Sequence, residues 1–292
     1  MKSVFRFLFR TILQYYPREY GKYTLLRKLY FPYLHSDTIS ASIVRMRAGF
    51  RLHLLPNELL QAHLYLFGTY ELPTTNFIRR FLKKGDCVID IGANIGYISL
   101  FCAQCVGKEG VVYAFEPEIK NYEALGANIA LNGVQNIITQ RLAVTEVETK
   151  LKLFLAEDNL GAHSTIYNED ALTQDYEEID GMPLDIFTSR NSIVKIDLVK
   201  IDVEGAEYEV LKSMKDILQN QRPVIIMEFN NSLQVKRGLS IEKIRKEIFE
   251  PNKYQIFSTT ESGKLIPFQD QKFENSVLLP DEKISQMAGF FS

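Results

Sequence analysis

The first residues able to do chemistry are Asp90, Gly92 and Gly96, which lie within one short stretch of the chain. The apolar run 87–91, broken only by Asp90, predicts a strand that is buried on both faces. Apolar residues recur with helical spacing from Ile98 onward, so both glycines lie in a turn between a strand and a helix. Such a turn lets a ligand approach the backbone closely and offers it unpaired N–H groups. We therefore predict that this turn binds a nucleotide-type ligand.

The charge of the turn indicates which ligand this is. A dinucleotide-binding turn reads G-x-G-x-x-G and holds a pyrophosphate, whereas only Gly92 and Gly96 are glycines here. We expect the Asp90 carboxylate to point towards the crevice, where it repels a pyrophosphate and attracts a cation. The ammonium and sulfonium groups of S-adenosylmethionine fit this requirement. A nucleotide-dependent oxidoreductase is the alternative on such a fold, and the missing glycine and Asp90 count against it.

A second carboxylate, Glu116, ends the next predicted strand, which begins at Val111. An acid at this point of a nucleotide-binding unit accepts hydrogen bonds from ribose hydroxyls. Pro117 follows it and suits the first turn of a helix. The glycine turn and the two acids together predict a site for an adenosyl cofactor.

Three motifs of the chain together resemble those of the FkbM-type, S-adenosylmethionine-dependent methyltransferases. They are Val-Ile-Asp-Ile-Gly-Ala-Asn-Ile-Gly at 88–96, Ala-Phe-Glu-Pro at 114–117 and Val-Lys-Ile-Asp-Val-Glu-Gly-Ala-Glu at 199–207, and Phe67-Gly-Thr-Tyr-Glu71 is similar as well. The resemblance covers residues 60–279 and implies a Rossmann-like sheet of seven strands that carries O-methylation of sugars, glycans or related natural products. The family often has Glu-x-His after the fifth strand, where this chain has Glu228-Phe-Asn230. A role for that histidine is therefore not carried over.

From these motifs we assign a cofactor site and a set of candidate bases. The expected cofactor-binding residues are Glu71, Asp90, Gly92, Ala93, Asn94, Gly96, Glu116, Ala143 and Asp202. The candidate bases are Asp202, Glu204 and Glu228, because a hydroxyl acceptor is a poor nucleophile until its proton is removed. All of them reach one rim if the ligand binds beyond the carboxyl ends of the strands. Positioning the acceptor against the methyl group can supply much of the catalysis, and we predict no metal site.

The elements that must position these residues alternate between strand and helix, which predicts an α/β protein with a doubly wound sheet and helices on both faces. The seven predicted strands are 87–91, 111–116, 137–142, 198–203, 224–229, 254–258 and 276–279, and 150–155 alternates like a partly exposed strand. An N-terminal extension, residues 1–60, with a helix and a hairpin at 43–54, precedes a methyltransferase domain at 61–292. The acidic segment 156–181, which holds His163, is expected to form a loop or lid.

Composition restricts the partners of the chain. With 292 residues, of which 46% are hydrophobic, it can fill the core of one α/β domain plus an extension. A net charge of −2 and the acidic segment argue against nucleic acid, which leaves a small-molecule or glycan acceptor. No apolar run reaches the ~18 residues of a membrane span, and no signal-peptide pattern precedes a cleavage site. We therefore expect a cytoplasmic protein.

The first residues predict a basic amphipathic helix. Its apolar face would carry Phe5, Leu8, Phe9 and Ile12, and its basic face Lys2, Arg6 and Arg10. Such a helix packs on its own domain or on a partner subunit of a homo-oligomer, or it lies on an anionic membrane surface or faces an anionic substrate. A non-catalytic S-adenosylmethionine-binding module, recruited to membranes by this helix, is therefore a further alternative. Cys102 and Cys105 have redox-type spacing, but they lie in the last turn of a predicted helix, so we expect core cysteines.

Overall fold

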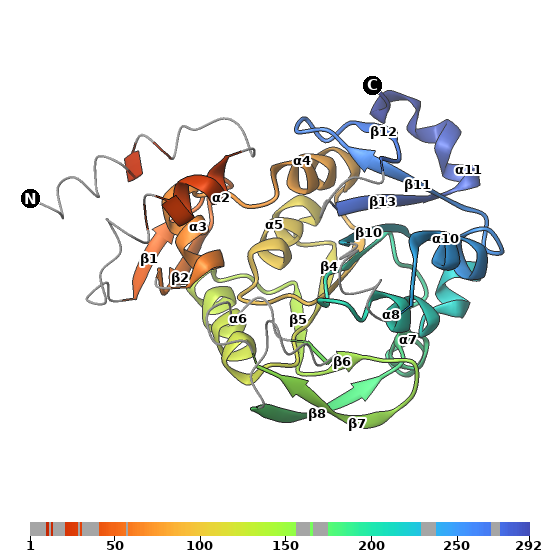
Figure 1. Cartoon of the computed structure of the whole chain (residues 1–292), viewed down its shortest axis with the longest axis horizontal. Helices are drawn as coiled ribbons and strands as arrows, with labels where there is room; N and C mark the ends of the chain where they lie inside the picture. The colour runs from red at the N-terminus through yellow and green to blue at the C-terminus, as the bar shows by residue number, and fades with distance from the viewer. Residues whose placement is uncertain are drawn as a thin grey trace, which may run out of the picture.

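An eight-stranded sheet forms the centre of the molecule (Figure 1). The computed structural model describes residues 10, 11, 13, 21–28, 30, 41–56, 58–155, 164–165, 175–228, 238–269 and 275–292. The strand order is β12-β11-β13-β10-β9-β3-β4-β5. The bounds are β3 Cys87–Ile91, β4 Val111–Phe115, β5 Ile137–Gln140, β9 Leu198–Ile201, β10 Val224–Glu228, β11 Tyr254–Thr259, β12 Leu265–Pro267 and β13 Asn275–Pro280.

The order and direction of these strands confirm the predicted Rossmann-like α/β fold. Strands β5, β4, β3, β9 and β10 run parallel, and β13 lies antiparallel between β10 and β11. All seven predicted strands are present, and the short edge strand β12 is one that we did not predict. Parallel strands that are buried on both faces read as continuous apolar runs, which is why they could be recognised.

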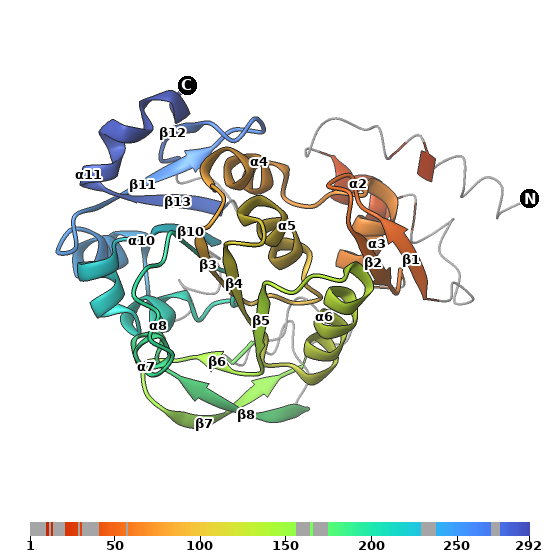
Figure 2. The ribbon, with the colours of Figure 1, turned by 180° about the vertical axis from the view of Figure 1, so that it is seen from behind.

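Helices cover both faces of the sheet, as predicted. Alternate residues of β3 belong to different cores: Val88 packs with Phe101 of α5, and Ile89 packs with Val210 of α8. The first layer holds α4 (Leu72–Phe81), α5 (Tyr97–Val106) and α6 (Ile119–Asn132). The second holds α7 (Leu184–Arg190), α8 (Glu207–Lys212), α10 (Ile241–Ile244) and the helical turns Ile217–Gln221 and Arg245–Phe249. The two groups lie on opposite sides of the strands from the front and from behind (Figures 1 and 2).

The hairpin of the N-terminal extension is part of the main core. It consists of β1 (Ser42–Arg45) and β2 (Arg51–Leu54), near α2 (Lys22–Leu25) and α3 (Leu59–Phe67). Val44 and Leu52 pack in the same hydrophobic cluster as Phe101. The main-chain N–H of His53 donates to Asn128 of α6 at 2.7 Å, which ties the hairpin to the helix. The division at residue 60 stays a prediction, and most of the predicted basic helix lies outside the described residues.

A second, three-stranded sheet corrects the expectation of a loop for residues 176–181, whereas most of 156–174 lies outside the described residues. It consists of β6 (Ala143–Val144), β8 (Tyr176–Met182) and β7 (Thr149–Phe154), in that order. The strand β7 was predicted, but β8 lies within the acidic segment. It forms a strand because Ile179 is buried against Leu153 of β7 while its acidic neighbours point outward. His163 lies outside the described residues.

The remaining described elements carry no site residue. The chain ends in α11 (Asp281–Ile284) and a 3-10 turn at Ser285–Phe290. Burial raises the pKa of the thiols of Cys102 and Cys105, as expected for core cysteines. Within the described part of the chain, no helix combines the length and the apolar character needed to cross a membrane.

Candidate functional site

A cavity of about 250 Å³ lies at the carboxyl ends of the parallel strands, where ligands of open α/β sheets bind. It brings together most of the predicted site residues, namely Gly92, Ala93, Asn94, Glu116, Ala143, Asp202, Glu204 and Glu228. Other parts of the wall come from Leu59, Leu60 and Tyr70 on the N-terminal side and from Leu153 and Thr165 near the second sheet. Glu71, Asp90 and Gly96 are not in the lining.

The glycine turn after β3 packs directly on the chain that leaves β9. Gly92 has φ 82°, and a Cβ there would lie 1.8 Å from the main-chain oxygen of Asp202. The N–H of Asp202 donates to the carbonyl of Ile91 at 3.0 Å, so a hydrogen bond also connects the end of β3 with the residue that follows β9. Asn94 also has a positive φ of 50°, which asparagine tolerates, and its Oδ1 accepts from the N–H of Ile95 at 2.7 Å. Only glycine at 92 permits this close approach.

Glu116 connects the second strand to the same turn. Its side chain is 6% exposed and lines the cavity. One carboxylate oxygen accepts from the N–H of Asn94 at 2.8 Å and the other from the N–H of Glu118 at 3.0 Å. Burial raises the pKa of Glu116 to about 8, although these two N–H groups lower it. The carboxylate is thus held in the wall of the cavity, where the hydroxyl groups of a bound ribose could donate to it.

Asp90 does not point into the cavity, which corrects our expectation. Its side chain is fully buried in β3, and the hydroxyl of Ser99 on α5 donates to its Oδ2 at 2.5 Å. Because side chains alternate along a strand, Asp90 faces the α5 layer while Ile91 faces the opposite one. Burial raises the pKa of Asp90, and the charge of Lys200 lowers it. A cofactor role for Asp90 stays a prediction, and the hydrogen bond to its side chain comes from Ser99.

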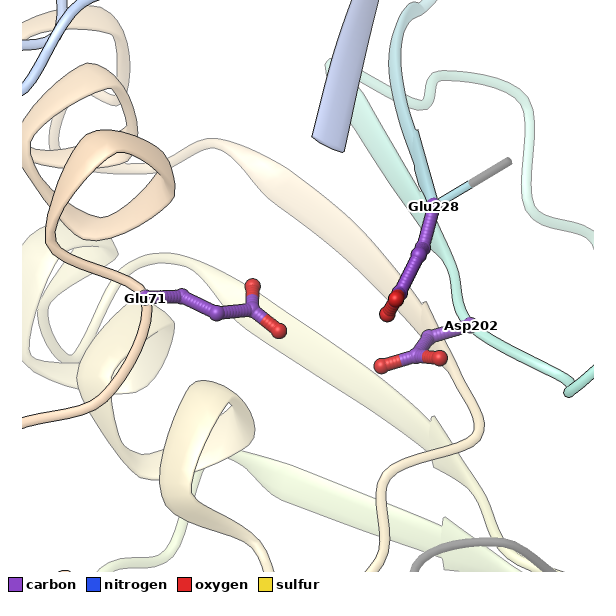
Figure 3. A group of neighbouring side chains, drawn as sticks. All are labelled: Glu71, Asp202 and Glu228. Carbon is purple, nitrogen blue, oxygen red and sulfur yellow. The ribbon is translucent and has the colours of Figure 1, made fainter. Parts of the chain in front are cut away.

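Three carboxylates from distant parts of the chain converge beside the cavity (Figure 3). Glu71 precedes α4, Asp202 follows β9 and Glu228 ends β10, and their carboxylate oxygens lie within 4.8 Å of one another. Asn275 of β13 donates its Nδ2–H to Oε2 of Glu71 at 2.7 Å. Burial raises the pKa of Glu228 well above its usual range, and the charges of Asp202 and Glu71 add to this. This arrangement places Glu71 beside two of the candidate bases.

Lys200 is a site residue that the sequence analysis missed. Its side chain is 2% exposed, lines the cavity, and its Nζ lies 2.6 Å from Oδ2 of Asp202. Burial lowers the pKa of Lys200, but the carboxylates of Asp202, Glu71 and Asp90 outweigh burial and raise it. Three carboxylates can hold a divalent cation, and here the ammonium of Lys200 already brings a positive charge to them. A lysine inside the otherwise apolar strand 198–201 was the signal available in the sequence.

Residues 90–256 match the family model for the methyltransferase FkbM domain, which is more than half of the chain. The chain is an FkbM methyltransferase. Among its relatives, methyltransferase sdnD of Sordaria araneosa is 26% identical over 61% of this chain and 82% of that protein. Hexuronic acid methyltransferase AglP of Haloferax volcanii is 26% identical over 60% of this chain and 70% of its own length. The 31-O-demethyl-FK506 methyltransferase FkbM of Streptomyces tacrolimicus is 29% identical over 46% and 62%, respectively.

The methyl donor of this FkbM methyltransferase is S-adenosylmethionine, which supplies a methyl group activated by a sulfonium centre. The residues at the cavity fit this donor. The turn 92–96 leaves room for a ligand against the backbone at the start of α5, and Glu116 presents a fixed, buried acceptor for hydroxyl groups. A pyrophosphate would meet four carboxylates in the lining, those of Glu116, Asp202, Glu204 and Glu228.

Cofactor binding by this methyltransferase should depend on pH through Glu116. If Glu116 accepts hydrogen bonds from the ribose hydroxyls, as we predict, binding requires its ionised form and favours loss of the proton that Glu116 holds below its pKa of about 8. The affinity for S-adenosylhomocysteine, which is uncharged at sulfur, should therefore rise with pH up to about 8 and then level off. Calorimetric titrations from pH 6 to 9 in buffers of different ionisation enthalpy would measure the affinity and the released proton. An affinity that is flat over this range would show that Glu116 does not change its charge on binding.

Proposed function

We propose that this methyltransferase transfers a methyl group to a hydroxyl oxygen of a sugar, a glycan or a related natural product. The observation that carries the proposal is the convergence of Glu71, Asp202 and Glu228 beside the cofactor turn. Carboxylates accept hydrogen bonds from hydroxyl groups, and an ionised carboxylate can take the proton that an attacking hydroxyl must lose. Two relatives support this chemistry by name, one acting on a hexuronic acid and one on an oxygen of FK506.

Asp202 is the base that we favour. It lines the cavity, its side chain is 21% exposed, and its ion pair with Lys200 fixes one carboxylate oxygen while leaving the other for the acceptor. Glu228 and Glu204 are the further candidates, and the raised pKa of Glu228 suits it to holding a proton rather than to removing one. In the transfer, the acceptor oxygen bonds to the methyl carbon, the carbon–sulfur electron pair stays on sulfur, and the hydroxyl proton moves to Asp202.

In this proposal the predicted cofactor-binding residues make different contacts with the ligands. Glu116 accepts from the ribose hydroxyls, and Gly92, Ala93 and Asn94 shape the floor of the site, while Gly96 lies behind them at the start of α5. Ala143 adds an apolar contact at the wall formed by β6. Glu71 is assigned here to the acceptor side, since its carboxylate meets those of Asp202 and Glu228.

The acceptor class can be tested with a panel of matched methyl glycosides. The protein is incubated with methyl-labelled S-adenosylmethionine and methyl glycosides of neutral hexoses, deoxyhexoses and hexuronic acids, and products are identified by mass spectrometry. We expect label on a hydroxyl oxygen of at least one glycoside, together with release of S-adenosylhomocysteine. Label on nitrogen, or on no compound of the panel and of a cell extract, would contradict the proposal. The second result would favour the non-catalytic binding module.

We also propose a cytoplasmic enzyme that touches anionic membranes through its N-terminal side. Arg45 and Arg51 are exposed on the outer face of the β1–β2 hairpin, beside Ile43, which is 55% exposed. Basic and apolar side chains on one face favour an anionic lipid surface. Co-sedimentation with vesicles of anionic against neutral lipid tests this contact, and the molecular mass in solution tests the predicted homo-oligomer.

A further inference from the structure

Lys200 is the cation of an otherwise acidic cavity. Among the described lining residues, the charged side chains are Glu116, Lys200, Asp202, Glu204 and Glu228. Lys200 is also almost completely buried, at 2% exposure of its side chain. A buried lysine is stable only beside carboxylates, and here one of them, Asp202, is bound at 2.6 Å. The ion pair is therefore part of the cavity wall and is not a solvent-exposed surface pair.

The strand register places Lys200 beside two of the acidic residues, Asp90 and Asp202. Lys200 lies opposite Asp90 across the β3–β9 pair, and Asp202 follows two residues later on the same face of the strand. Burial lowers the pKa of Lys200, and the charges of Asp202 after β9, Glu71 before α4 and Asp90 on β3 raise it. Glu228 at the end of β10 feels the same lysine, since its charge lowers the pKa of that carboxyl.

The positive sulfur of the cofactor belongs on this side of the cavity. Glu116, at the end of β4, is the acceptor for the ribose, while the carboxylates that can serve the methyl acceptor follow β9 and β10. Because the sulfonium joins the ribose and the methyl group, it would lie between the residues that serve them, Glu116 and Asp202, when the cofactor is bound. An all-acidic site there would hold the cation strongly. Such binding does not speed transfer, because the positive charge on sulfur disappears as the methyl group leaves.

We propose that Lys200 sets the charge of the cofactor site: paired with Asp202, it limits how much more tightly the site holds the cationic methyl donor than its neutral product. Lys200 is a positioning residue in this scheme, since it acts on the cofactor through the field of the cluster and through the orientation of Asp202. The inference rests on the cofactor and not on the identity of the acceptor. A failed acceptor panel and a failed test of Lys200 are therefore distinguishable.

The test is the ratio of two dissociation constants, that of S-adenosylhomocysteine over that of S-adenosylmethionine, measured by calorimetry at pH 8. Lys200→Met removes the charge and keeps an unbranched apolar chain, and it should raise the ratio about tenfold, the order expected for one unit charge within a partly buried site. Lys200→Arg should keep the wild-type ratio. The matched control is Lys195→Met. The Lys195 side chain is 68% exposed, forms an ion pair with Asp197 at 2.7 Å, and is not part of the cavity lining.

Two further variants separate the charge effect from a loss of structure. Asp202→Asn leaves the lysine without its carboxylate, and the double variant Asp202→Asn with Lys200→Met removes both charges. The ratio of dissociation constants measured for the double variant should be about tenfold higher than the ratio for Asp202→Asn. It should be close to the ratio for the wild-type protein. This comparison holds even if Lys200→Met alone does not fold, because the double variant removes the ammonium together with the carboxylate bound to it. An unchanged ratio in a folded Lys200→Met protein, or equal ratios in the last two variants, would overturn the proposal.

Discussion

The Glu116→Ala variant is expected to bind S-adenosylhomocysteine roughly 30- to 1000-fold more weakly than the wild-type protein, which corresponds to about 2–4 kcal/mol. The alanine removes the acceptor for the ribose hydroxyls. It also releases the N–H groups of Asn94 and Glu118, which the carboxylate holds at 2.8 Å and 3.0 Å. The turn still keeps its main-chain contacts to the end of β4, where the N–H groups of Gly92 and Ala93 donate to the carbonyl of Phe115 at 3.0 Å and 2.9 Å. The loss of the ribose acceptor acts on the bound state alone, so weaker binding follows from it directly.

Calorimetric titration gives this affinity, and circular dichroism on heating reports whether the variant is folded. Glu123→Ala is the matched control, because Glu123 lies on α6, the helix that follows Glu116, is exposed and does not line the cavity. It should bind S-adenosylhomocysteine as the wild type does. If folded Glu116→Ala keeps its affinity within a few-fold, the ribose is held elsewhere and the assignment of Glu116 is wrong.

The Asp202→Asn variant is expected to lose turnover by ~100-fold or more while its affinity for S-adenosylhomocysteine stays within a few-fold of the wild type. Asparagine keeps the shape of the side chain and an oxygen for Lys200, but it cannot receive the acceptor's proton. The product is uncharged at sulfur, so its binding reports contacts and shape more than the net charge of the site. Asp202→Asn should therefore lower turnover without lowering the affinity for S-adenosylhomocysteine, whereas Glu116→Ala should lower both.

Asp216→Asn serves as the control for this substitution, because Asp216 is exposed and makes no side-chain cap at the helical turn that follows it. It should keep both turnover and affinity. A folded Asp202→Asn protein that binds S-adenosylhomocysteine as poorly as Glu116→Ala would make Asp202 a cofactor ligand. Full turnover in Asp202→Asn would leave Glu228 and Glu204 as the candidate bases.

The elements on the cofactor side of the site could be predicted from short stretches of the sequence. The apolar run 87–91 became β3 as predicted, the two glycines form the turn, and Glu116 lies at the end of the next strand. These features depend on neighbours in the chain, where burial on both faces and the spacing of glycines leave a direct pattern. The doubly wound α/β class followed from the alternation of strands and helices, whereas the order of the strands came from the structure.

The acceptor side could not be read in this way, because it depends on contacts between distant residues. Glu71 meets Asp202 and Glu228 only after α4 has packed beside the sheet. Lys200 was overlooked because its strand reads as apolar, and a buried lysine makes sense only once its carboxylate partners are known. The direction of the Asp90 side chain was mistaken because the register that turns it towards Ser99 depends on the helix layers.

The contact of Gly92 with the main chain of Asp202 has a consequence for how this enzyme can diversify. Since no side chain fits between the two loops, the cofactor turn and the favoured base form one inherited unit that tolerates neither a substitution at 92 nor an insertion before 202. New acceptor ranges must then arise in walls outside that unit. Leu59 and Leu60 on one side and Leu153 and Thr165 on the other are such walls. A library built on these four positions, with 92 and 202 untouched, is where directed evolution of this chain should begin.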